Sequence, residues 1–287
     1  MSEIIAYKDQ NNEYFDFEIE NSKPVRAKSD DALNIMRHDM AHILAEAVIS
    51  IFPAAKPTIG PFIKNGFYYD FDMDSALSDD DINKIEEKIK EILNEGREFN
   101  KKVVSKDEAL NFFKDNKYKL ELINNLDNAA EITLYEQKNF TDLCKGPHHK
   151  STKEYEAHVK ITNVSGAYWR GISTNKMLQR VYATAWYSEK ELNKYLKNLE
   201  EAKERNHRRL GTDMGLFLLT DLSAGNVFWK DKGLTLYQNI EKYIRAEQRK
   251  LNYYEVKTPE LVYNELWIKS GHWAHFKENM FTSETDN

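Results

Sequence analysis

Two short motifs bring together side chains that can do chemistry. In His38-Asp-Met-Ala-His42 the two imidazoles are four residues apart, which places them on one face of a helix. In Cys144-Lys-Gly-Pro-His148 a thiol and an imidazole stand on either side of a Gly-Pro turn, where they can converge. Cys144 is the only cysteine, so it can act as a thiol or a ligand but not in an internal disulfide.

Two chemistries suit these groups, and spacing alone leaves both open. Three histidines and one thiolate can form a tetrahedral zinc shell, which is structural when closed and hydrolytic when water takes one position. Without a metal, the same groups can position a water molecule on an ester while a histidine or a lysine amine handles the proton. A histidine pair on a helix can also be simply packed in a core.

The first motif lies in a predicted helix that begins at Ser29-Asp30-Asp31 and continues to Ile51. One apolar stripe of this helix contains Leu33, Met36, Met40, Ile43 and Ala47. The opposite side contains Ile35, His38, His42, Ala45 and Ile49, and only Asp39 and Glu46 form a charged stripe. A helix that is apolar on two faces packs on two faces, so we expect the histidine pair to point into the protein.

The remaining patterns predict an α+β fold. Residues 3–28 alternate weakly and predict two or three short strands, too few for an independent core. Helices are predicted from Ser78 (buried stripe Ile82, Ile85, Ile89 and Ile92), near 108–113, over 189–209 up to Gly211, and near 234–251. Strands are predicted at 67–71, 103–104, 119–123, 132–135, 159–164, 167–170, 177–185 and 254–258, the last stopped by Pro259.

Composition limits the class of protein. The 287 residues suggest about two domains, and 41% hydrophobic residues exclude a disordered chain. No apolar run is long enough for a membrane span, and the first residues do not resemble a signal peptide. With a single cysteine, these features predict a cytoplasmic protein without membrane partners. The net charge of −6 requires any phosphate-binding surface to be a local patch. The basic stretch 203–209 is either such a patch or a solvated connector.

Several segments resemble bacterial threonyl-tRNA synthetases. They are residues 37–47, 59–70, 141–148, 165–171, 175–180 and 266–273, and the likeness covers roughly residues 29–287 in order. A related module occurs in alanyl-tRNA synthetases and in free-standing trans-editing proteins. The connector helix and the Trp267–Trp273 stretch favour the threonyl family.

The resemblance implies a domain organisation. Residues 29–188 would be an editing domain, with an antiparallel sheet packed around the histidine-bearing helix, that hydrolyses serine wrongly esterified to threonine tRNA. Residues 189–210 would be a charged linker helix. Residues 211–287 would be the truncated beginning of a class II catalytic domain, with motif 1 at 234–259. Residues 1–28 would be a reduced remnant of the family's ubiquitin-like N-terminal TGS domain or a different appendage.

The family's editing residues carry over by position. The expected catalytic side chains are His38, His42, Lys119, Cys144 and His148. Tyr69 and Asp142 match substrate-pocket residues, and Asp142 and His149 flank the thiol motif. The family's editing site is read as metal-free, whereas alanyl-type relatives hold zinc with similar ligands. We therefore expect no metal; if zinc is present, its ligands are His38, His42, Cys144 and His148.

Further expectations concern the longer enzyme. ATP, magnesium and a second zinc would belong to a full-length catalytic domain, whose motifs 2 and 3 would lie beyond Asn287. Aminoacylation is therefore not expected from this chain. The expected partners are threonine tRNA and, for the full-length enzyme, a second subunit bound through the motif 1 region. Two alternatives stay open: a zinc-dependent alanyl-type trans-editing hydrolase, and a catalytically silent module for tRNA binding or dimerisation.

Overall fold

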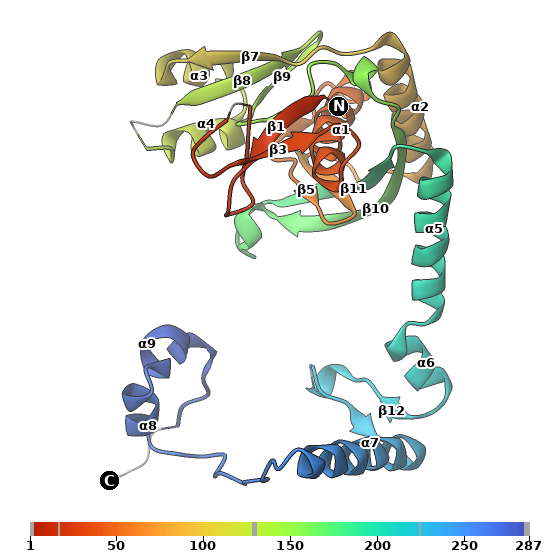
Figure 1. Cartoon of the computed structure of the whole chain (residues 1–287), viewed down its shortest axis with the longest axis vertical. Coiled ribbons are helices and arrows are strands. Elements are labelled where there is room, and N and C mark those ends of the chain that lie inside the picture. The colour runs from red at the N-terminus through yellow and green to blue at the C-terminus, as the bar shows by residue number, and fades with distance from the viewer. Residues whose placement is uncertain (1–2, 17, 128–130, 224, 284–287) are drawn as a thin grey trace. The chain divides into compact units, whose positions relative to one another are not determined.

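The computed structural model describes residues 3–16, 18–127, 131–223 and 225–283 (Figure 1). The chain divides into two compact units, residues 1–202 and 203–287. Helices and strands are mixed, and every strand pairing in the described residues is antiparallel, which confirms the α+β class. The domain limits predicted from the sequence stay predictions, and the outermost ones, residues 1 and 287, lie outside the described residues.

The first unit begins with a small sheet in the order β2-β1-β3. Its strands are β1 (Ile4–Lys8), β2 (Tyr14–Phe15) and β3 (Lys23–Arg26). The short strands expected in this segment are therefore present. Ala6 and Val25 of this sheet are buried against Ala32 and Ile35 of the following helix. The sheet thus shares its core with the rest of the unit, because three short strands bury too little apolar surface by themselves.

Helix α1 (Asp30–Ile51) begins where the sequence predicts, because the Ser29 hydroxyl accepts the Ala32 N–H at 3.1 Å. It is buried on both faces, as expected. Its charged stripe does not face solvent: Asp39 is 0% and Glu46 3% exposed. Glu46 can be buried because the Arg97 guanidinium pairs with it at 2.8 Å.

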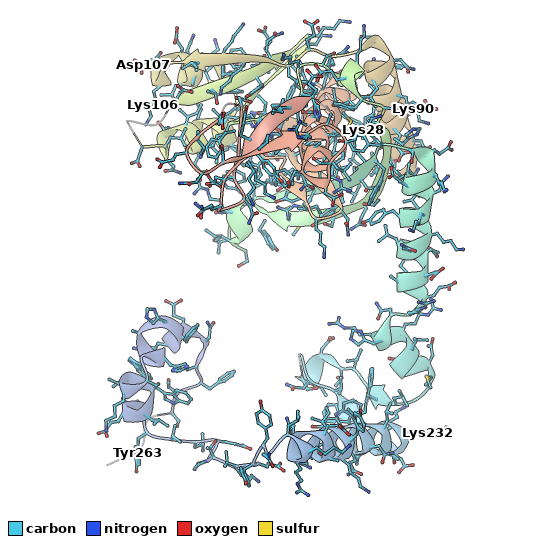
Figure 2. The ribbon with its side chains drawn as sticks, in the orientation of Figure 1. Lys28, Lys90, Lys106, Asp107, Lys232 and Tyr263 are labelled. Atoms are coloured by element: carbon cyan, nitrogen blue, oxygen red, sulfur yellow. The ribbon has the colours of Figure 1, made fainter. Side chains whose placement is uncertain are left out.

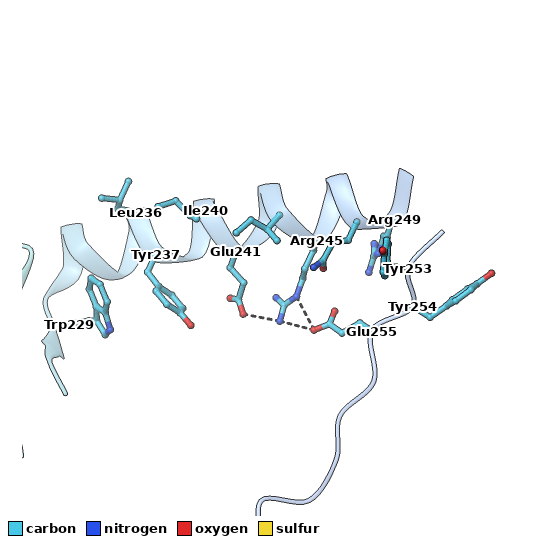
Figure 3. A pocket seen from close by; sticks show the side chains of 12 residues that line it. Trp229, Leu236, Tyr237, Ile240, Glu241, Arg245, Arg249, Tyr253, Tyr254 and Glu255 are labelled. Atoms are coloured by element: carbon cyan, nitrogen blue, oxygen red, sulfur yellow. Dashed lines mark hydrogen bonds and ion pairs between the residues drawn. The ribbon is translucent and has the colours of Figure 1, made fainter. Parts of the chain in front are cut away.

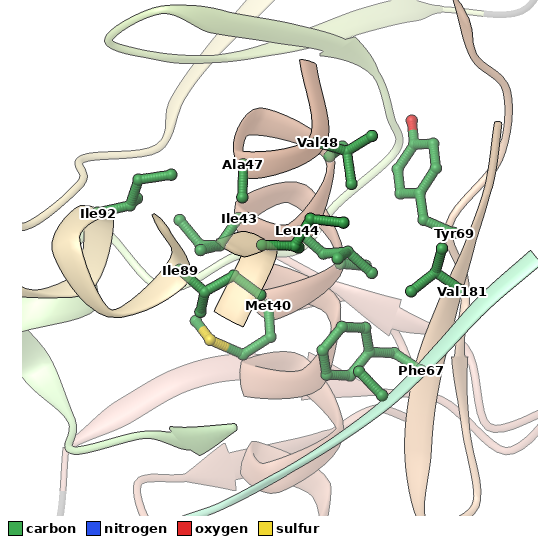
Figure 4. Packing of buried hydrophobic residues seen from close by; sticks show 14 of the residues in the cluster. Met40, Ile43, Leu44, Ala47, Val48, Phe67, Tyr69, Ile89, Ile92 and Val181 are labelled. Carbon is green, nitrogen blue, oxygen red and sulfur yellow. The ribbon is translucent and has the colours of Figure 1, made fainter. Parts of the chain in front are cut away.

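The main sheet has the order β10-β11-β6-β4, with β5 also paired to β6. Its strands are β4 (Lys56–Pro57), β5 (Phe62–Ile63), β6 (Gly66–Asp72), β10 (His158–Tyr168) and β11 (Met177–Trp186). Helix α2 (Asp79–Glu95) starts with a capping box at Ser78. Figure 4 shows Met40 and Ile43 of α1 packed towards Ile89 and Ile92 of α2, with Phe67 of β6 in the same core.

A third sheet carries the residues around the thiol motif. It has the order β7-β8-β9, from β7 (Asn100–Val104), β8 (Ile132–Gln137) and β9 (Phe140–Leu143). Helices α3 (Lys106–Phe112) and α4 (Lys117–Asn124) lie between β7 and β8 in sequence. The strand predicted at 119–123 is wrong, because the Asn116 side chain accepts the N–H groups of Tyr118 and Lys119 and starts α4.

Two other predictions from the sequence need correction. The strands predicted at 159–164 and 167–170 are one strand, β10, which keeps pairing with β11 from His158 to Tyr168 and ends in a 3₁₀ turn at Trp169–Gly171. The helix predicted over 189–209 is two helices, α5 (Glu189–Glu204) and α6 (His207–Asp213). The Asn206 side chain caps α6, and Gly211 lies inside α6 instead of ending it.

The second unit contains α6, a two-stranded sheet and the long helix α7 (Asp231–Lys250). The other elements are β12 (Phe217–Leu218), β13 (Phe228–Trp229), α8 (Asn264–Lys269) and α9 (His272–Phe276). The strand predicted at 254–258 is absent from the described chain. Tyr254 is 90% and Val256 82% exposed, and no strand pairs with this segment to supply the hydrogen bonds of a sheet.

Charged side chains cover the surface of both units. Figure 2 labels Lys28, Lys90 and Asp107 in the first unit and Lys232 in the second, all of them exposed. Within the described ranges, no helix is both long enough and apolar enough to cross a membrane.

Candidate active site

The two motifs meet in one cluster of side chains. Helix α1 carries His38 and His42, and the loop after β9 carries Cys144 and His148. The Cys144 sulfur lies 2.9 Å from His38 Nε2 and 3.4 Å from His148 Nε2. The ring centroids of His42 and His148 are 4.4 Å apart. One ligand atom from each of the four side chains lies within 4.8 Å of the others.

Strand β8 fixes the position of the thiol loop. The Cys144 N–H donates to the Thr133 carbonyl at 3.2 Å, and the Thr133 hydroxyl donates to the Cys144 carbonyl at 2.5 Å. The Gly146 N–H then donates to the Cys144 sulfur at 3.2 Å. Gly146 has a φ of +74°, and a Cβ there would collide with the Tyr135 hydroxyl, so only glycine fits this turn.

A second group of side chains adjoins the cluster. Asp142 of β9 pairs with the Lys119 ammonium from α4 and accepts a 2.5 Å hydrogen bond from the Tyr69 hydroxyl of β6. Lys119 is 2% and Asp142 4% exposed. His42 Nε2 lies 3.9 Å from Asp142 Oδ2 and joins this group to the cluster. The structure therefore brings together all the side chains that the sequence selected; their roles stay predictions.

Burial sets the protonation states in the cluster. Burial, together with the charge of a neighbouring histidine, lowers the pKa of His38 to about 4 and that of His42 to about 3. Burial also lowers the pKa of His148 well below its usual range and raises the pKa of Cys144 to about 12. At neutral pH these three imidazoles are uncharged and Cys144 is a thiol.

Asp142 behaves differently from the histidines. Burial by itself would raise its pKa. The charge of Lys119, the charge that His42 carries once protonated, and the hydrogen bonds from Lys119 and Tyr69 together outweigh burial and lower the pKa. The site therefore contains a buried carboxylate–ammonium pair beside uncharged imidazoles. Such a pair can stabilise charge that develops on a neighbouring group.

Sequence reasoning missed the residues that position His148 through its Nδ1 atom. Asp39 Oδ1 lies 2.8 Å from His148 Nδ1, and Asp39 Oδ2 lies 2.7 Å from His149 Nδ1. The Tyr155 hydroxyl donates to Asp39 Oδ2 at 2.8 Å. One available signal was a charged residue on a helix that is apolar on two faces, since such a residue is buried and must be paired.

Comparisons with known proteins point to one family. The family described as "Threonyl and Alanyl tRNA synthetase second additional domain" matches residues 132–182, which contain β8, β9 and the thiol motif. The chain is 47% identical to the threonine–tRNA ligase of Ehrlichia chaffeensis, over all of this chain and 46% of that protein. It is 46% identical to the threonine–tRNA ligase of Wolbachia pipientis, over 98% of this chain and 45% of that protein.

The chain is a homologue of the threonine–tRNA ligases. This confirms the resemblance seen in the sequence motifs. The match to the ligase of Pelagibacter ubique is also 47% identical and covers 41% of that protein. The chain thus spans just under half the length of the curated relatives it matches.

Within this ligase homologue, the cluster has a donor set that suits zinc. Zinc in proteins is bound by histidine nitrogen and cysteine sulfur, commonly four in number. His38, His42, Cys144 and His148 supply these donors at mutual distances within 4.8 Å. Bound zinc would require the Cys144 thiol to lose its proton. The residues present can therefore hold a metal such as zinc.

A cavity of about 360 Å³ opens beside His38. Its wall includes Tyr14, Phe62 and Lys145, so the N-terminal sheet and the thiol loop both contribute. On the same wall Asp16 pairs with Lys101 at 2.7 Å and accepts a 3.1 Å hydrogen bond from Tyr135. A polar ligand can approach the cluster from this side.

A larger cavity, of about 530 Å³, lies along α7 (Figure 3). Its lining includes Leu236, Ile240 and Tyr237, which are each about half exposed. Arg245 lies in the same groove and pairs with Glu241 and Glu255, both at 2.9 Å. The described lining therefore combines half-exposed apolar side chains with a charged group.

Proposed function

We propose that this chain removes serine that has been wrongly esterified to the tRNA for threonine. One observation carries the proposal: two motifs about a hundred residues apart place three uncharged imidazoles and a thiol around one point. The relatives are named as threonine–tRNA ligases, and the matched family is named for the threonyl and alanyl synthetases. We infer from these names that the cluster of His38, His42, Cys144 and His148 acts on an aminoacyl-tRNA.

The reaction answers a limit on recognition. Serine is threonine without a methyl group, and one methyl in a binding pocket discriminates by only ~1–3 kcal/mol. A second site that hydrolyses the smaller product corrects the remaining errors. The threonyl ester is not hydrolysed if the extra methyl group of threonine occupies the position of the attacking water.

Water, and not the thiol, is the nucleophile that the electrostatics favour. A thiol attacks as its thiolate, and burial raises the pKa of Cys144 to about 12. In the proposed step, His38 and Lys119 hold the water and His38 accepts its proton. The water oxygen bonds to the ester carbonyl, and the bond to the ribose oxygen breaks as that oxygen takes the proton. The products are serine and free tRNA.

The other side chains have orienting roles in this proposal. Cys144, His42 and His148 face the seryl group, and Asp142 with Tyr69 forms the wall beside Lys119. As His38 gains a proton, the nearby negative charges of Asp39 and Asp142 favour the charged imidazole. Such stabilisation strengthens in a site from which water is excluded.

We propose that this reaction needs no metal. The rival is a zinc-dependent hydrolase of the alanyl type, in which zinc held by His38, His42, Cys144 and His148 would polarise the ester or activate water. Metal analysis of the purified chain, and hydrolysis of seryl esters on threonine tRNA compared with alanine tRNA, separate the two. A catalytically silent module predicts salt-sensitive tRNA binding without hydrolysis.

The deciding experiment follows release of serine from seryl-tRNA for threonine by the purified chain. His38→Ala and Lys119→Ala are assayed beside it, with the threonyl ester as the second substrate. The proposal expects rapid serine release, little threonine release, and slow variants. Binding without release by the parent chain would refute the function, and parent-like rates in both variants would refute the roles given to these residues.

The same context suggests the roles of the other segments. We propose that residues 29–188 are the editing domain, 189–210 a linker and 211–287 the beginning of a class II catalytic domain. Aminoacylation, and the binding of ATP, magnesium and a second zinc, would belong to a longer enzyme. A second copy of the chain would cover the apolar face of α7. Sedimentation of Ile240→Glu beside the parent chain tests this contact, because a charge on that face would leave the variant monomeric.

A further inference from the structure

We propose that Asp39 is a positioning residue that sets the direction of the hydrogen bonds through Cys144. It holds His148 with its proton on Nδ1, so that Nε2 accepts the thiol proton. The activity readout below rests on the proposed hydrolysis, whereas the spectroscopic readout does not.

The first step concerns the carboxylate itself. Asp39 is 0% exposed, and its two oxygens face His148 Nδ1, His149 Nδ1 and the Tyr155 hydroxyl at 2.7–2.8 Å. A carboxylate only accepts hydrogen bonds. Each imidazole nitrogen that faces Asp39 must therefore carry a proton, which fixes the tautomer of both histidines.

The second step concerns the other nitrogen of His148. With its proton on Nδ1, a neutral His148 has a lone pair on Nε2, which lies 3.4 Å from the Cys144 sulfur. The ring is held in place by Phe99, which stacks on it at 4.8 Å and 8°, and by His38 at 4.4 Å and 23°. The lone pair is therefore aimed at the sulfur, and the S–H bond is the donor that satisfies it.

The third step concerns the sulfur. A thiol has one proton, so an S–H bond directed at His148 leaves lone pairs on the remaining side. That side accepts the Gly146 N–H at 3.2 Å and faces His38 Nε2 at 2.9 Å. Because the sulfur has no second proton to offer, His38 Nε2 must donate to it. The nitrogen of His38 that can accept a proton is therefore Nδ1, which has no hydrogen-bond partner among the described residues.

Asp39→Asn tests this arrangement with little change of shape. An amide offers one acceptor and one donor group to the two imidazoles, so at least one histidine must change its tautomer. We expect serine release to slow by ~10–100-fold, by analogy with the loss found when the carboxylate that orients a metal-binding histidine is removed. KM should change less than threefold, because the shape of the pocket is kept. The matched control is Tyr155→Phe, which removes a hydrogen bond to Asp39 but leaves both imidazoles paired; we expect it to keep activity within threefold.

Nitrogen NMR of the imidazoles measures which ring nitrogen carries the proton. A purely structural role of Asp39 would not change this measurement. In the parent chain, with His148 assigned through a His148→Gln variant, we expect Nδ1 protonated and Nε2 bare. Asp39→Asn should change the tautomer of His148 or His149, and Tyr155→Phe should change neither. A parent spectrum with the His148 proton on Nε2 overturns the inference, even if Asp39→Asn does not fold. A parent chain that shows the expected tautomer but releases no serine refutes the proposed function and leaves the positioning role of Asp39 standing.

Discussion

The buried ion pair between Lys119 and Asp142 can be tested with variants in which the loss of folding stability differs from the loss of hydrolytic activity. Both residues are almost completely buried: Lys119 is 2% and Asp142 4% exposed. Removing one partner of such a pair leaves an uncompensated charge in the interior, which costs ~3–5 kcal/mol. Removing both charges costs much less, because no buried charge remains to be solvated. We therefore expect Lys119→Met and Asp142→Asn each to lose ~3–5 kcal/mol of unfolding free energy, and the double variant to lose less than either single variant.

Urea unfolding followed by circular dichroism measures these values, and serine release is assayed on the same four samples. The matched control is Lys138→Met, which breaks the 2.7 Å pair with Glu95, where the two side chains are 56% and 49% exposed. Exposed pairs contribute ~0–1 kcal/mol, so the control should unfold and hydrolyse almost like the parent chain. The double variant should be folded but inactive, because both charged groups of the proposed site are gone.

Two results would refute this reasoning. If the double variant loses as much free energy of unfolding as the two single variants together, the charges do not interact in the folded chain. If the double variant is stable and still releases serine at the parent rate, Lys119 and Asp142 have no part in the proposed reaction. A stable double variant without activity supports both the pairing and the role.

Three other predictions follow from the same structure. The unfolded chain binds protons on His38 and His42 near pH 6.5 and the folded chain only near 4 and 3, so the free energy of unfolding should fall by ~2 kcal/mol per histidine between pH 7 and pH 5; urea midpoints at the two pH values check this, and equal midpoints contradict the burial of both rings. Incubation with a chelator should leave the rate of serine release unchanged. If the chelator instead abolishes serine release and added zinc restores it, the zinc mechanism is favoured, and zinc should then fail to restore release in Cys144→Ser. Ser78→Ala removes the capping box of α2 and should lower the thermal midpoint, with a cost of ~1 kcal/mol, while serine release by the folded chain stays the same.

Local signals in the sequence predicted part of the fold and the composition of the site. Ser29 and Ser78 marked the starts of α1 and α2 because a side-chain oxygen before a helix accepts its first N–H groups, whatever the rest of the chain does. The two apolar faces of α1 predicted its burial. Strand and helix could not be told apart at 119–123, where the alternation of Lys119, Leu120, Glu121 and Leu122 fits a strand, while the cap at Asn116 and the packing of Ile123 favour a helix.

The sequence by itself determined which chemical groups are available: one thiol, histidines at helical and turn spacings, and the helix that carries two of them. Only the tertiary structure decided that β8 and α1 hold the two motifs at contact distance, that Asp39 lies behind His148, and that Lys119 pairs with Asp142. Spacing along a chain controls which residues share a face over a few turns. Contacts between residues a hundred positions apart, and the pKa shifts that burial causes, depend on how complete elements pack against one another.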